Sequence, residues 1–93
     1  MDERCKRIRF RAWRRGFREI DLILGAFADQ HLNELDEAGL AEFERLLDTP
    51  DQEVYAWIVG REPPPPEADG PVLSLLKSFR YFARTAAAER PAS

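Results

Sequence analysis

Apolar residues recur at steps of three and four through most of the chain, which is the spacing of one face of an α-helix. The pattern predicts five helices, over residues 4–15, 18–32, 37–48, 50–59 and 72–88. The second of them carries the clearest stripe, formed by Ile20, Ile23, Leu24, Phe27, His31 and Leu35. We therefore expect an all-α protein, a small single-domain helical bundle of about five helices.

The same stripes predict which side chains are buried. We expect the second, third and fourth helices to bury Ile20, Ile23, Leu24, Phe27, Leu40, Phe43, Leu47 and Ile58. The apolar face of the last helix should hold Val72, Leu75, Leu76, Phe79, Phe82, Ala83 and Ala86. In the first helix Cys5, Ile8 and Ala12 share one stripe, so one of Phe10 and Trp13 should be exposed.

Glycine and capping residues mark where the helices begin and end. Gly16 interrupts the helical pattern and predicts a turn, because glycine inside a helix costs about 1 kcal/mol relative to alanine. Asp36 is expected to cap the third helix and Thr49 the fourth, with Gln52 completing a capping box. Gly60 is the expected terminator of the fourth helix.

The length of the chain suits one domain, which we expect to span residues 1–93. Residues 1–3 and 89–93 are expected to fray. Residues 61–70 should form a proline-rich linker inside that domain, because consecutive prolines favour an extended chain that continues neither neighbouring helix.

Charge is strongly segregated along the chain, although the net charge is only −3. Residues 1–18 carry eight basic and two acidic side chains, a balance of +6. Residues 19–69 carry two basic and fourteen acidic side chains (−12), and residues 70–93 carry four basic and one acidic side chain (+3). The carboxylates of the third helix are expected on its solvated face: Glu37, Glu42 and Glu44. Such polarity favours either an intramolecular match between segments or two different partner surfaces.

A basic cluster covers the first helix and the turn that follows: Arg4, Lys6, Arg7, Arg9, Arg11, Arg14, Arg15 and Arg18. It is the feature of this sequence that best suits nucleic-acid binding. The competing interpretation is a solvated face that attracts the acidic half of the same chain. We favour the second interpretation, because the sequence pI of about 5.2 is far below that of a typical nucleic-acid-binding domain.

Several classes of function are not expected. With one cysteine, Cys5, and one histidine, His31, neither an internal disulfide nor a zinc site is expected. No apolar run approaches the roughly 20 residues of a membrane span, and Asp2 and Glu3 argue against a mitochondrial leader, so we expect a cytoplasmic protein. Because no nucleophile–base pair or phosphate-binding glycine spacing is evident, we expect an interaction protein and not an enzyme. The charge segregation and the absence of a surplus apolar stripe favour a monomer.

The chain is organised around the stretch Arg15-Gly16-Phe17-Arg18-Glu19, where the basic segment meets the clearest helix. Glu19 falls in the first turn of that helix, where the positive end of the helix dipole favours a carboxylate. An arginine, a glycine and a carboxylate on one small surface would admit a partner's backbone closely and offer both signs of charge. Alternatively, Arg15 and Glu19 would form an ordinary surface pair of a continuous helix, worth about 0.3–0.5 kcal/mol.

Arg15-Gly16-x-x-Glu19, followed by Asp21, resembles the signature of the succinate dehydrogenase flavinylation factors. A second block of that family is similar to the run Phe43-x-x-Leu46-Leu47-x-x-x-Asp51-x-x-Val54-Tyr55-x-Trp57-Ile58-x-Gly60. The resemblance implies a small helical assembly factor that binds the flavoprotein subunit of succinate dehydrogenase, of fumarate reductase or of both. It would promote covalent attachment of FAD to a histidine of that subunit, with no cofactor held tightly by this chain.

The resemblance also implies a partner-binding site at Arg15, Gly16, Glu19 and Asp21. Arg15 would clamp a carboxylate or carbonyl of the partner, and Gly16 would permit close approach. Glu19 would orient the acceptor histidine or a neighbouring donor. Asp21 either belongs to this surface or is a second helix-start charge. The alternative function is a small regulatory or nucleic-acid-binding protein, antitoxin-like, that uses the basic first helix.

Overall fold

The computed structural model describes residues 3–79, and every regular element in this part of the chain is helical. In chain order the elements are α1 (Glu3–Ala12), α2 (Arg18–His31), the 3-10 turn η1 (Leu32–Glu34), α3 (Glu37–Leu47) and α4 (Asp51–Val59). Residues 71–79 form a further helical segment. The predicted all-α fold is confirmed for the described residues. The predictions for residues 89–93 and for Phe82, Ala83 and Ala86 lie outside them.

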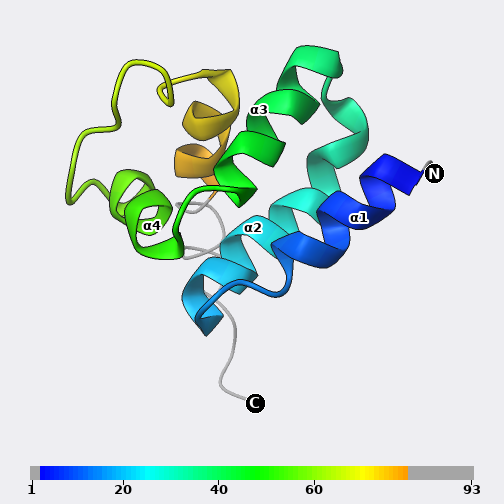
Figure 1. Ribbon diagram of the computed structural model, residues 1–93, viewed down its shortest axis with the longest axis horizontal. Helices are drawn as coiled ribbons and strands as arrows, with labels where there is room; N and C mark the ends of the chain where they lie inside the picture. Colours follow the sequence, from blue (N-terminus) through cyan, green and yellow to red (C-terminus); the bar gives the residue numbers. More distant parts are fainter. Residues whose placement is uncertain (1–2, 80–93) are drawn as a thin grey trace, which may run out of the picture.

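α1 and α2 pack side by side, joined by a turn at residues 13–17, and α1 also contacts α3. In Figure 1, α1 and α4 lie on opposite sides of α3. The α1–α2 turn and the start of α4 meet beside the end of α3, and the site described below lies there.

The core is built from apolar side chains of all the described helices. The ring of Phe27 stacks on Phe43 with centroids 5.7 Å apart and meets Phe79 edge-on. The largest fully buried side chains are Phe27, Phe43, Ile8, Ile20, Leu24, Leu32, Leu73, Leu76, Val54 and Val72. Of the core residues predicted in α2, α3 and α4, Leu40 is only partly buried, and all the others are buried.

The first helix buries its predicted stripe and exposes one aromatic side chain. Phe10 is 58% exposed, whereas Trp13 is partly buried against α2. The indole Nε1 of Trp13 donates a hydrogen bond to Asp29 Oδ2 at 3.1 Å. A Cβ atom at Gly25 would overlap the Trp13 ring, so α1 and α2 can pack this closely only with glycine at that position.

In the segment 71–79, Leu73 takes the buried place that the sequence predicts for Leu75. Leu75 is 49% exposed and Leu73 is fully buried. Helical spacing allows Leu73 or Leu75 to share the buried face with Val72 and Leu76, so the sequence alone does not decide between them. The hydrogen bond from the Leu73 amide to Glu42 Oε2 is consistent with the observed rotation of this segment.

Three of the four predicted helix boundaries are confirmed, including the turn at Gly16. The Asp36 carboxylate accepts a hydrogen bond from the Gly39 amide at 2.8 Å, and Gly60 ends α4 in the left-handed region with φ of 83°. The predicted cap of α4 is wrong. The Thr49 hydroxyl donates to the Arg45 carbonyl at 2.9 Å, so it satisfies the end of α3, and α4 begins at Asp51 after Pro50 without a side-chain cap.

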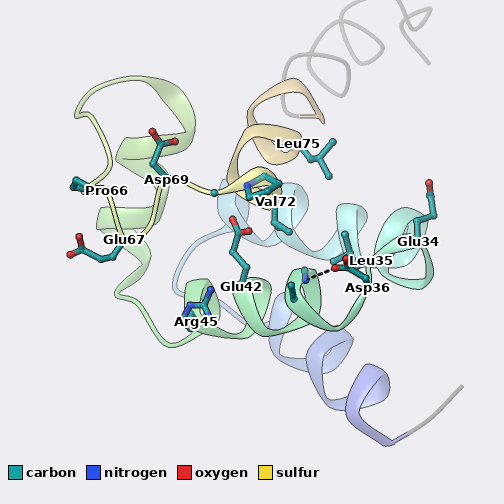
Figure 2. Close-up of a pocket in the computed structure, with 14 residues that line it drawn as sticks. Glu34, Leu35, Asp36, Glu42, Arg45, Pro66, Glu67, Asp69, Val72 and Leu75 are labelled. Carbon is teal, nitrogen blue, oxygen red and sulfur yellow. Dashed lines mark hydrogen bonds between the residues drawn. The ribbon is translucent and has the colours of Figure 1, made fainter.

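Glu42 is buried, which corrects the prediction that it shares the solvated face of α3 with Glu37 and Glu44. The residue is 8% exposed, and its Oε2 accepts a hydrogen bond from the Leu73 amide at 3.0 Å. Figure 2 shows Glu42 pointing from α3 toward the start of the segment 71–79. The first amides of a helix have no partner within it, so Glu42 caps a helix other than its own.

Candidate functional site

The motif Arg15-Gly16-x-x-Glu19, followed by Asp21, lies at the turn between α1 and α2. We call it the motif below. Arg15 and Gly16 belong to the turn, whereas Glu19 and Asp21 lie in the first turn of α2. The turn sits against the junction of α3 and α4, so four separate elements determine its shape.

Arg15 is engaged inside the protein. Its side chain is only 8% exposed, and Nη2 donates to the Thr49 carbonyl at 2.7 Å while Nη1 donates to the Leu47 carbonyl. Its Nε lies 2.5 Å from Asp51 Oδ1, which forms an ion pair. The two carbonyls lie at the end of α3, where backbone acceptors lack helical partners and a cation is favoured. Arg15 therefore ties the α1–α2 turn to the start of α4.

The structure does not form the ordinary surface pair between Arg15 and Glu19, because the guanidinium faces the end of α3. Glu19 is exposed, and within residues 3–79 it makes no hydrogen bond or ion pair. The role of Arg15 as a clamp on a partner remains a prediction. Its contacts show in addition that it shapes the turn from within.

Gly16 is exposed on the same turn and lies directly over Asp51. A Cβ atom at this position would lie 2.5 Å from Asp51 Oδ2, closer than atoms of this kind normally approach. Its backbone is not left-handed, since Gly60 is the one glycine with positive φ in the described part of the chain. A larger residue here would have to displace the Asp51 carboxylate, which is paired with Arg15, and no unusual backbone angle is involved.

Asp21 and Phe17 fix the turn from the α2 side. Asp21 Oδ1 accepts a hydrogen bond from the Arg15 amide at 2.6 Å, so this carboxylate closes the turn. The Phe17 ring meets Tyr55 of α4 edge-on with centroids 5.1 Å apart. Asp51 pairs with Arg15 and lies against Gly16, a contact that sequence reasoning missed although Asp51 belongs to the second block of the resemblance.

The basic residues of α1 are largely neutralised by carboxylates of the same chain. Arg4 pairs with Glu37 and Glu44 at 2.6 and 2.7 Å. Two further pairs join α1 to acidic residues, at 3.2 Å for Arg9–Asp29 and at 2.7 Å for Arg11–Asp48. These pairs favour an intramolecular match as the explanation for the charge segregation.

The pair of Arg4 and Glu44 also shifts the ionisation of both groups. The hydrogen bond from Arg4 holds the pKa of the Glu44 carboxyl below its usual range, and burial opposes this effect. The hydrogen bonds to Glu44 and Glu37 raise the pKa of Arg4. The effect is local, because these groups lie at the start of α1 and on α3, away from the motif.

A separate cavity of about 570 Å³ opens between α3 and the loop at residues 66–71 (Figure 2). Carboxylates dominate its charged lining, and none of the motif residues contributes to it: the charged residues are Glu34, Asp36, Glu42, Arg45, Glu67 and Asp69. Within residues 3–79 no three side chains of His, Cys, Asp or Glu lie close enough together to hold one metal ion, the carboxylates of this cavity included. No helix in the same range is long and apolar enough to cross a membrane.

The described helices form a small bundle, and the turn between α1 and α2 exposes Gly16 and Glu19 while Arg15 and Asp21 hold it from within. Residues 6–80 match the family described as the flavinator of succinate dehydrogenase, and the chain belongs to this family. The match includes both the motif turn and the α3–α4 junction that supports it.

Individual relatives support the assignment. The chain is 33% identical over 81 residues to a protein of Danio rerio named succinate dehydrogenase assembly factor 2, mitochondrial, covering 85% of this chain and 51% of that protein. It is 36% identical over 70 residues to an FAD assembly factor of Acetobacter pasteurianus, covering 75% of this chain and 64% of the relative. A Scheffersomyces stipitis protein with the same name as the Danio rerio one is 44% identical over 57 residues, covering 61% of this chain and 38% of the relative. The chain spans about half the length of the curated relatives it matches.

The prediction of a cytoplasmic protein is wrong. The relatives from Danio rerio and Scheffersomyces stipitis are both named as mitochondrial. The prediction rested on the lack of an apolar span and on Asp2 and Glu3, and neither feature distinguishes the cytoplasm from the interior of another compartment.

Proposed function

We propose that this chain is an assembly factor that binds the flavoprotein subunit of succinate dehydrogenase and promotes covalent attachment of FAD to it. Family membership supports this proposal, as do the names of relatives that are called succinate dehydrogenase or FAD assembly factors. The flavoprotein of fumarate reductase is the second client expected from the resemblance.

The observation that carries the proposal is the exposed pair of Gly16 and Glu19 on a turn that is held from within. Arg15, Asp21 and Asp51 use their hydrogen bonds and ion pair to fix that turn. The Glu19 carboxylate therefore stays available to a donor of the client, beside a residue that adds no side-chain bulk. A rigid surface loses little conformational entropy when the partner binds.

The contribution proposed for this chain is positional. The bond between the flavin and the histidine forms within the client, and its chemistry belongs to the cofactor. An assembly factor accelerates the step by holding the client so that histidine and flavin approach in a reactive geometry. In this proposal the chain is not an enzyme in its own right, it holds no cofactor tightly, and FAD is the group that the client receives. It acts as a monomer that binds the client transiently.

The test uses purified flavoprotein subunit without FAD, incubated with FAD in the presence and absence of this chain. We expect covalent flavin, read as fluorescence of the subunit after a denaturing gel, to form faster when the chain is present. Parallel reactions with the fumarate reductase flavoprotein show whether both are clients. The proposal is overturned if neither flavoprotein gains flavin faster with the folded chain than with an equal amount of albumin.

A further inference from the structure

One face of α1 remains basic after the internal ion pairs have formed. Lys6, Arg7 and Arg14 are exposed, and none of them forms an ion pair with a carboxylate of residues 3–79. Arg7 adds a weaker attraction toward Glu44, which already pairs with Arg4. This leaves three cations available to a partner.

These cations surround an exposed aromatic ring. Phe10 is 58% exposed, and the Arg14 guanidinium carbon lies 3.8 Å from the centroid of its ring, a cation–π contact. Lys6 and Arg7 are four and three residues before Phe10, so these three side chains share one side of α1, away from the buried stripe. Arg14 lies in the turn that follows α1 and joins them through its contact with the ring of Phe10. We call these four residues the Phe10 face. Figure 1 shows α1 at the edge of the bundle.

The Phe10 face is continuous with the motif, because Arg14 directly precedes Arg15. On the basis of the proposed function, we propose that the Phe10 face is a second contact with the client and docks an acidic segment of it that carries an apolar residue. The carboxylates of that segment would meet the three cations, and its apolar side chain would cover the ring of Phe10. Exposed aromatic and arginine side chains are the residue types that most often anchor protein interfaces.

The structure favours an acidic protein segment over a nucleic acid. Arg14 already covers one side of the Phe10 ring, which reduces the surface open to base stacking. The remaining basic residues of α1 are paired internally, so only three cations of this face could contact phosphates. Few phosphate contacts give weak binding to nucleic acid, because most of its affinity comes from phosphate neutralisation. The net charge of −3 adds a general repulsion of polyanions.

The experiment measures association of the purified flavoprotein subunit with immobilised wild-type chain and with the variants Lys6→Glu and Phe10→Ser. Arg45→Glu is the matched control, because Arg45 is exposed on α3 and its side chain has no ion pair within residues 3–79. Lys6→Glu and Arg45→Glu change the net charge equally. Circular dichroism checks that all variants fold, as expected for exposed positions.

We expect Lys6→Glu to lower the association rate constant about fivefold at roughly 50 mM salt, with a smaller effect at roughly 300 mM, because salt screens steering charges. Phe10→Ser should raise the dissociation rate constant about five- to thirtyfold, since it removes an anchor. Arg45→Glu should change neither rate constant more than about twofold.

The outcomes separate this inference from the proposed function. If Glu19→Ala weakens client binding but Lys6→Glu and Phe10→Ser match wild type, the Phe10 face is not a contact and the proposed function stands. If wild type itself does not bind the flavoprotein, both fail. If the two variants lose affinity for a labelled 20-nucleotide RNA but keep wild-type affinity for the flavoprotein, the face binds nucleic acid and the inference is overturned.

Discussion

Replacing Arg15 tests whether this residue holds the motif turn from within. The side chain is 8% exposed and connects to two carbonyls and the Asp51 carboxylate. Arg15→Ala would leave the carboxylate without its partner and the carbonyls of Leu47 and Thr49 without this donor. Each hydrogen bond from the guanidinium is worth about 1.5–3 kcal/mol, and the pair with Asp51 contributes less because that side chain is 24% exposed. We therefore expect a loss of about 3–5 kcal/mol, a large share of the roughly 5–15 kcal/mol typical of a folded domain. The melting temperature should fall by at least about 12 °C.

The assay is urea unfolding followed by tryptophan fluorescence, since Trp57 is buried and reports on the core. Arg15→Lys should be intermediate, because an ammonium keeps the charge but cannot reproduce the two-pronged contact. Arg18→Ala is the control, because Arg18 is exposed and unpaired within the described residues, and it should lie within about 0.5 kcal/mol of wild type. A loss below about 1 kcal/mol for Arg15→Ala would refute the reasoning.

Three further outcomes follow from the contacts around α3 and the motif turn. Glu42→Ala should lower the free energy of unfolding by about 1.5–3 kcal/mol in urea titrations, because it removes a charged acceptor from a buried amide. Gly16→Ala should destabilise the protein by about 1–3 kcal/mol by the same assay, since its Cβ would press on Asp51, and an unchanged midpoint would contradict that packing. Because Arg4 lowers the folded-state pKa of Glu44 below 4.5, this carboxylate stabilises the protein above that pH. The advantage of wild type over Glu44→Gln should shrink as the pH falls from about 5 to about 3, and a constant difference would count against the pair.

The helical fold was predictable because periodicity and capping agree through most of the described chain. Ile20, Leu24 and Phe27 fall on one face of a helix because of their spacing alone. Gly60 ends α4 because its own backbone adopts the left-handed conformation. Glu42 was not predictable in this way. Its burial depends on the Leu73 amide, which is 31 residues away, and helical spacing within α3 carries no information about that contact.

The candidate site shows the same division between local and long-range information. The sequence located the turn at Gly16 and the position of Glu19 at the start of α2, both of which are local properties. It did not reveal that Arg15 is directed inward, because the carbonyls of Leu47 and Thr49 and the carboxylate of Asp51 come from the other side of the fold. Within the motif, Arg15 therefore supports the turn from inside the protein, whereas Gly16 and Glu19 are exposed.

In the proposed function, Glu19 acts on the client and contributes little to the fold. Glu19→Ala should unfold within about 1 kcal/mol of wild type, since a helix-start carboxylate on the surface contributes about 0.3–1 kcal/mol. The most direct measurement is covalent flavin on the succinate dehydrogenase flavoprotein in cells that lack their own factor and express either wild-type chain or Glu19→Ala at equal levels. Glu53→Ala, an exposed glutamate of α4, is the matched control. We expect Glu53→Ala to restore flavin fluorescence to the wild-type level and Glu19→Ala to leave it near that of cells without the factor. Full fluorescence with Glu19→Ala would mean that Glu19 does not act on the client.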